Sequence, residues 1–97
     1  MQPQINMAIQ VLPRAKNIHP YDIVDKAIEL IQQSGLKYQV CPFETVVEGS
    51  YQEVIALIEK VHMACYNAGA DELICNIKIQ TSSLKEVCID DKMNKYR

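Results

Sequence analysis

The stretch Tyr38–Ser50 reads YQVCPFETVVEGS, and it decides the fold because it can supply two strands. Both of its ends favour β structure, whereas Pro42 and the two residues after it interrupt the run. Proline has no backbone N–H to donate to a central ladder, so it belongs at a break between strands. We therefore predict one strand over 37–41, a tight corner over 42–44, and a second strand over 45–48.

The segments on either side of this stretch repeat one plan. Residues 5–12 (INMAIQVL) and 73–81 (LICNIKIQT) alternate between two sets of side chains, which is typical of a strand buried on one face. In the second of these strands the expected buried set is Leu73, Cys75, Ile77 and Ile79. We expect Pro13 to end the first strand.

Two helices are predicted between the strands, each with recognisable start and stop signals. Pro20 suits the first position of a helix, and apolar residues then recur at helical spacing until Gly35. Ser50 and Glu53 form an S-x-x-E capping box ahead of a second apolar stripe, which Gly69 ends. Both halves of the chain therefore run strand, helix, glycine, strand.

This order predicts an α+β, ferredoxin-like βαββαβ sandwich: an antiparallel sheet with two helices on one face. A chain of 97 residues suffices for one such domain, spanning 1–97. After it, we expect a short fifth strand over 85–89 and a final helical turn capped by Asp90.

Composition narrows the classes of partner. The net charge is −2 with both signs interspersed, so we expect no nucleic acid and no anionic lipid surface. No apolar run approaches the ~20 residues that span a bilayer. The N-terminal MQPQINMAIQVLP lacks the basic and hydrophobic regions of a signal peptide, so the expected location is cytoplasmic.

Catalytic and metal chemistry find little support in the residue pattern. The four cysteines contain no C-x₂-C pair and occupy apolar-periodic positions, which favours buried free thiols over zinc ligands. His19 precedes a helix and His62 lies within one, and neither has a placeable acid partner. We expect no enzyme, no catalytic residue, no metal and no cofactor.

The face of the sheet opposite the helices would carry mostly amides and small residues. It takes Asn6, Ala8 and Gln10 from the first strand, Gln39 and Cys41 from the second, and Asn76, Lys78 and Gln80 from the last. Such a surface suits a neutral heterocycle, a wet subunit interface, or plain exposure to water.

The corner adds candidate ligand contacts. Thr45 offers a hydroxyl, Phe43 a stacking plane, and Glu44 and Glu48 acceptors for an aminopyrimidine or a cationic ring. The alternative makes Phe43 a core plug and the two glutamates solvated edge charges.

Several landmarks together resemble the small thiamine-binding protein family. They are a first strand ending in V-L-P, the helix IVDKAIELIQQSGLKY, the pattern Y-x-V-x-P-x-x-T-x-x-E-G over 38–49, and a C-terminus ending DKMNKYR. The resemblance implies a ferredoxin-like fold assembled as homodimers or homotetramers. It also implies non-catalytic binding of thiamine or its hydroxymethylpyrimidine half.

Carried onto this sequence, the resemblance implies a ligand site that includes Thr45 and Glu48, while Asn76 joins them from strand geometry. Cys41 and Phe43 stand where family members are expected to have smaller or more polar residues. The ligand-binding candidates are therefore Thr45, Glu48, Phe43, Cys41 and Asn76. The alternative function is a structural or partner-binding module whose pocket is plugged by Phe43.

Overall fold

A computed structural model describes residues 3–97, and its element order confirms the βαββαβ prediction. The strands are β1 (Ile5–Arg14), β2 (Lys37–Val40), β3 (Thr45–Gly49) and β4 (Glu72–Gln80). The helices are α1 (Pro20–Gln33), α2 (Tyr51–Asn67) and α3 (Ile89–Met93), followed by the 3₁₀ helix η1 (Asn94–Tyr96). Met1 and Gln2 of the predicted 1–97 domain lie outside the described residues.

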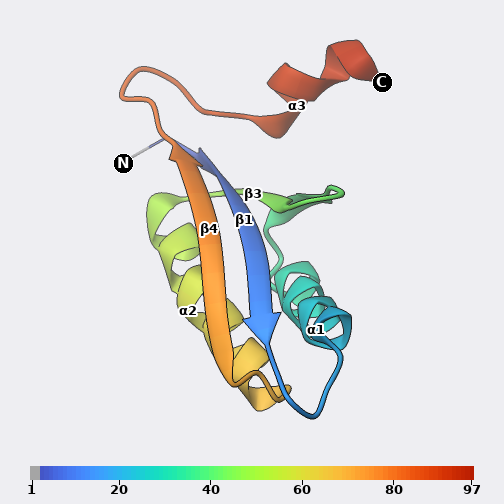
Figure 1. Cartoon of the computed structure of the whole chain (residues 1–97). Coiled ribbons are helices and arrows are strands. Elements are labelled where there is room, and N and C mark those ends of the chain that lie inside the picture. Colours follow the sequence, from blue (N-terminus) through green and yellow to red (C-terminus); the bar gives the residue numbers. More distant parts are fainter. Residues whose placement is uncertain (1–2) are drawn as a thin grey trace.

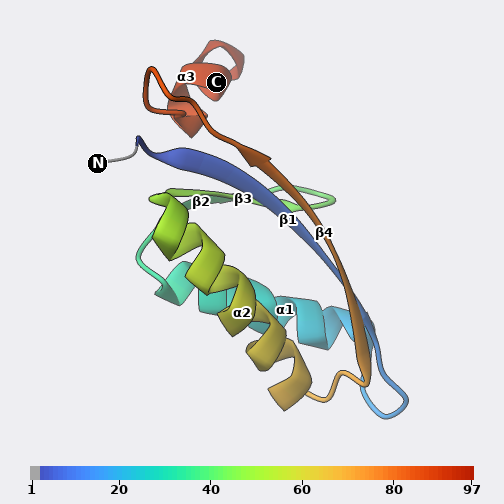
Figure 2. The same cartoon turned by 90° about the vertical axis from the view of Figure 1, so that its left-hand side faces the viewer.

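The strands form one antiparallel sheet in the order β2-β3-β1-β4, with α1 and α2 together on one face (Figures 1 and 2). The predicted corner is present, because β2 ends at Val40 and β3 begins at Thr45. Cys41 N donates to Glu44 O at 2.9 Å and closes this turn.

The predicted helix signals act as their chemistry suggests. Ser50 Oγ accepts from Glu53 N while Glu53 Oε1 accepts from Ser50 N, both at 3.2 Å, so the capping box at the start of α2 is complete. Gly35 (φ 80°) and Gly69 (φ 111°) adopt the left-handed conformation after α1 and α2.

The hydrophobic core lies between the sheet and the two helices. Side chains buried there come from every second residue of β1 and β3 and from one stripe of each helix: Ile5, Met7, Ile9, Val47, Ile23, Ala27, Ile31, Val54, Leu57, Val61 and Cys65. No helix among residues 3–97 has the length and apolar character to span a bilayer.

Three boundary predictions were wrong. The strand β1 continues through Pro13 to Arg14, because its pairing with β3 stops at Ile9 and beyond that point Pro13 lies on an open edge. Residues 85–88 form no strand, since the only backbone bond to the sheet region there is from Val87 N to Gln4 O. Asp90 lies inside α3 rather than capping it.

The predicted buried face of β4 is only partly buried: Leu73 and Cys75 are half-buried, and the two isoleucines after them are exposed. Ile77 and Ile79 share the helix-side face with Ile9 and Met7 but remain 36% and 41% exposed. The reason is that β4 is an edge strand, so neighbours cover it from one side only.

Candidate functional site

The face of the sheet away from α1 and α2 carries the polar residues expected from the alternation. The β1–β4 register places Asn6 beside Gln80, Ala8 beside Lys78 and Gln10 beside Asn76. Asn76 Nδ2 donates to Gln10 Oε1 at 3.0 Å, which links the two strands across this face. We call it the open face.

The end of the chain returns across part of the open face. Residues 87–97, which we call the cover segment, lie on the side of the sheet opposite α1 and α2 (Figure 2). Within it, Val87 and Ile89 are almost fully buried. Asn6, itself buried, donates from Nδ2 to Val87 O at 2.8 Å, so the first strand anchors the start of the segment.

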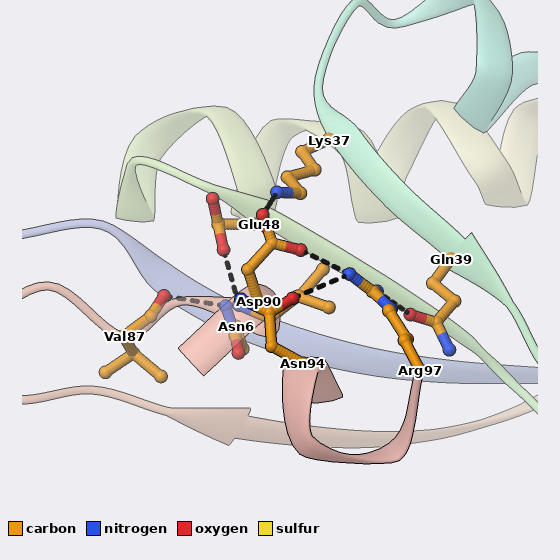
Figure 3. Close-up of polar contacts among 9 residues, drawn as sticks. Asn6, Lys37, Gln39, Glu48, Val87, Asp90, Asn94 and Arg97 are labelled. Carbon is orange, nitrogen blue, oxygen red and sulfur yellow. Dashed lines mark hydrogen bonds and ion pairs between the residues drawn. The ribbon is translucent and has the colours of Figure 1, made fainter. Parts of the chain in front are cut away.

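Glu48 fixes the first turn of α3 from outside the helix. Its Oε1 accepts from Ile89 N at 2.7 Å (Figure 3). A carboxylate at a helix N-terminus compensates an unpaired N–H and the positive end of the helix dipole. The α3 N-cap residue, Cys88, makes no side-chain cap bond, so Glu48 supplies what the local sequence does not.

Asp90 is the centre of an ion-pair network that ties the cover segment to β2. Its carboxylate pairs with Lys37 Nζ and accepts from Arg97 Nη1 at 2.8 Å, while Arg97 Nη2 donates to Gln39 Oε1 at 3.1 Å (Figure 3). The hydrogen bond from Lys37, followed by that from Arg97, lowers the pKa of Asp90 below its ordinary value. The same bond to Asp90 raises the pKa of Lys37.

Between the cover segment and the open face lies a cavity of about 420 Å³, which we call the open-face cavity. This volume is within the range of small-molecule sites, roughly 300–1,000 Å³. Its lining combines amide side chains with apolar ones and two lysines: Asn6, Gln39, Gln80, Ala8, Cys41, Val46, Ile79, Ile89, Met93, Lys78 and Lys92.

Lys92 contributes from α3 to the wall of this cavity. Its Nζ donates to Asn6 Oδ1 at 2.9 Å and to Gln80 Oε1. The ammonium group therefore rests on two neutral amide oxygens, one from β1 and one from β4.

The candidate residues from the sequence do not converge on one site. Cys41 lines the open-face cavity, whereas Glu48 supports the cover segment and Asn76 lies on the open face outside the lining. Thr45 and Phe43, together with Cys41 again, line a second cavity of about 130 Å³, bordered by residues of β1, α1 and the corner. Thr45 and Glu48 are three residues apart in one strand, so their side chains point to opposite faces of the sheet.

Phe43 does not plug the open-face cavity. Its side chain is 81% exposed and is absent from that lining, so the alternative of a pocket plugged by Phe43 does not hold for this cavity. The physical reason is its place in the corner between β2 and β3, where it borders the second cavity described above instead.

Sequence reasoning missed the contribution of the cover segment. The terminal DKMNKYR serves there only as a landmark of the resemblance, so Lys92, Met93 and Arg97 have no predicted role, and Asp90 has only that of a helix cap. The available signal was the i, i+3 and i, i+4 spacing that gathers Ile89, Lys92 and Met93 on one side of a helical turn.

The contacts of the cysteines and histidines fit structural roles. All four thiols are free, and burial, with a smaller effect of Cys75, raises the pKa of Cys65 to about 11. His19 Nδ1 accepts from Tyr21 N at 3.1 Å as the N-cap of α1, and His62 Nδ1 lies 2.9 Å from Ile58 O. Within residues 3–97, no three His, Cys, Asp or Glu side chains are grouped so as to hold a metal ion.

This chain is similar to known proteins over nearly its whole length. A family model described as thiamine-binding protein matches residues 7–97. A UPF0045 protein of Clostridium perfringens is 35% identical over 92 residues, covering 95% of this chain and 96% of that protein.

Two solved structures share the fold closely. A domain of unknown function from Bacillus cereus is 42% identical with a TM-score of 0.94, covering 99% of this chain and 92% of that one. A Thermotoga maritima protein provisionally described as a thiamine biosynthesis or salvage protein is 27% identical with a TM-score of 0.88, covering 98% and 100%.

Proposed function

Because the chain belongs to the thiamine-binding protein family, we propose that it binds thiamine or its hydroxymethylpyrimidine half, without catalysis, in the open-face cavity. The observation that carries this proposal is that the cavity takes its lining from both the sheet and the cover segment. A bare antiparallel sheet face offers no concavity, and the cover segment supplies the missing wall.

The lining matches the chemistry of an aminopyrimidine. Amide groups of Asn6, Gln39 and Gln80 can each donate and accept, as the ring nitrogens and the exocyclic amine require. Val46 and Met93 provide apolar surface for the faces of the ring. Recognition by hydrogen bonds and packing needs no cofactor, and we expect none.

A thermal-shift titration with thiamine and with hydroxymethylpyrimidine tests the proposal. A ligand that binds only the native state at 100 times its Kd stabilises it by about 2.7 kcal/mol, which raises the Tm by several degrees. The variant Ala8→Leu should fill the cavity and abolish the shift, while Asn76→Leu, on the same face outside the lining, should retain it. Absence of a saturable shift with both compounds would refute the proposal.

Phe43 separates this proposal from the structural or partner-binding alternative. Because its ring is exposed and outside the lining, Phe43→Ser should leave ligand affinity unchanged. Affinity gained in this variant would restore the plugged-pocket hypothesis. If Phe43→Ser lost affinity, Phe43 would instead stack on the ligand, and the site would lie at the corner, where Phe43 and Thr45 line the second cavity.

We also propose that the chain self-associates as a homodimer or homotetramer in the cytosol. The support is the edge strand β4, whose exposed Ile74, Ile77 and Ile79 leave apolar surface beside unpaired backbone groups. Light scattering on the eluting protein gives the mass. A monomer across the micromolar range would contradict this expectation.

A further inference from the structure

The charged groups in the wall of the open-face cavity are of one sign. Lys78 and Lys92 line it, and the lining contains no Asp or Glu. The protein as a whole carries a net charge of −2, so this concentration of positive charge is local. A cavity wall with a single sign of charge favours a ligand of the opposite sign.

Lys92 is the better placed of the two lysines. Asn6 donates from Nδ2 to Val87 O, which fixes its amide so that Oδ1 accepts from Lys92 Nζ. A lysine ammonium has three N–H donors, and the amides of Asn6 and Gln80 take two. Among residues 3–97, Lys92 forms no ion pair, so neutral oxygens hold its position without cancelling its charge.

Lys78 reinforces this charge more weakly. Its Nζ lies 3.8 Å from Glu44 Oε1, a long and mostly solvent-exposed ion pair. Such pairs contribute little and are readily exchanged for a better partner. Lys78 on β4 and Lys92 on α3 both line the cavity and are exposed, so an anion arriving from solvent can reach either ammonium group.

We propose that the open-face cavity is selective for the phosphate ester of its ligand, with Lys92 as the residue that recognises the phosphate. This inference rests on the proposed function and names the chemical form that the site takes. The aromatic part of the ligand would occupy the amide-lined region near Gln39, and the ester arm would reach the ammonium group. The free thiazolium cation of unphosphorylated thiamine would be disfavoured at that position.

Calorimetric titration of the full chain tests the assignment with four compounds: hydroxymethylpyrimidine, its monophosphate, thiamine and thiamine monophosphate. A charge-assisted hydrogen bond should make each ester bind about 10- to 100-fold more tightly than its parent. The preference should shrink with added salt. It should also shrink below pH ~6, where a phosphate monoester loses its second charge.

The variant Lys92→Met keeps the unbranched shape of the side chain, shorter by one atom, and removes its charge, so it should bring ester and parent to equal affinity. Lys95→Met, in the adjacent η1 where Lys95 contacts the Tyr96 ring, is the matched control and should keep the preference. If Lys92→Met loosens the cover segment, the salt and pH dependence of the unaltered chain decides the question.

The outcomes separate the two proposals. Parent compounds that bind as tightly as their esters would overturn the phosphate assignment and leave the proposed function standing. Parent compounds that bind measurably, with each ester binding at least 10-fold more tightly, would support the assignment. No binding of any of the four would overturn both, and a response to inorganic phosphate equal to that of the esters would also overturn the assignment.

Discussion

Replacing Glu48 with alanine should release the cover segment without unfolding the sheet. The change removes the acceptor that lies 2.7 Å from Ile89 N, at a position where Cys88 supplies no alternative cap. Hydrogen bonds to charged groups contribute about 1.5–3 kcal/mol. Opening of residues 87–97 should therefore become easier by that amount, which corresponds to about 10- to 150-fold more of the open form.

Amide hydrogen exchange measures this directly. The Ile89 amide should lose about 10- to 150-fold in protection in Glu48→Ala, while the amides of Met7 and Val47 in the sheet should keep theirs. Glu48→Gln retains an acceptor oxygen and should show a smaller loss, nearer the ~0.5–1.5 kcal/mol of a neutral bond. Unchanged exchange at Ile89 in the alanine variant would refute the support assigned to Glu48. If the glutamine variant instead lost ligand affinity with normal exchange, Glu48 would be a ligand contact, as the sequence suggested.

Three further predictions follow from pKa values and packing. Because the folded state lowers the pKa of Asp90 below 3.8 and raises that of Lys37 above 10.5, the stabilisation from their pair is present between these values. This stabilisation is lost as the pH falls through the lowered pKa of Asp90 or rises through the raised pKa of Lys37. The NMR chemical shift of the Arg97 amide, measured against pH, should report both transitions. Met7→Ala, at a fully buried core position, should lower the free energy of unfolding by about 2–5 kcal/mol with an unchanged m-value in urea. Cys65, with a pKa of about 11 and no exposure, should resist alkylation at pH 8 in native protein, and modification there as fast as in urea would contradict its burial.

The fold was predictable because its signals are local. Pro42 marks the corner, Ser50 and Glu53 form their capping box within one turn, and Gly35 supplies a positive φ where a helix ends. Each of these features depends on residues only a few positions apart, so the local sequence is enough to predict it without the tertiary structure.

The site was predictable only in part because its geometry depends on distant contacts. Alternation correctly assigned Gln39 and Cys41 to the open face, but grouping Thr45 with Glu48 ignored that three residues along a strand reverse the side. The role of Lys92 depends on Asn6, which lies 86 positions away in the sequence. No periodicity within the last turn could have indicated that partner.

The span of these contacts also sets when the cavity can form during folding. Apart from the bond between Lys92 and Gln80, the bonds from the cover segment to the sheet join positions 41 to 86 residues apart, between Glu48 and Ile89 at one extreme and Asn6 and Lys92 at the other. Contacts of such long range are favourable only after the strands that present their partners are in place. A chain interrupted near Gln80 would hold every strand and both long helices yet lack the wall of the cavity that Ile89, Lys92 and Met93 provide. Ligand-binding competence should therefore be the last property to appear in refolding, after the sheet has reached its native spectrum.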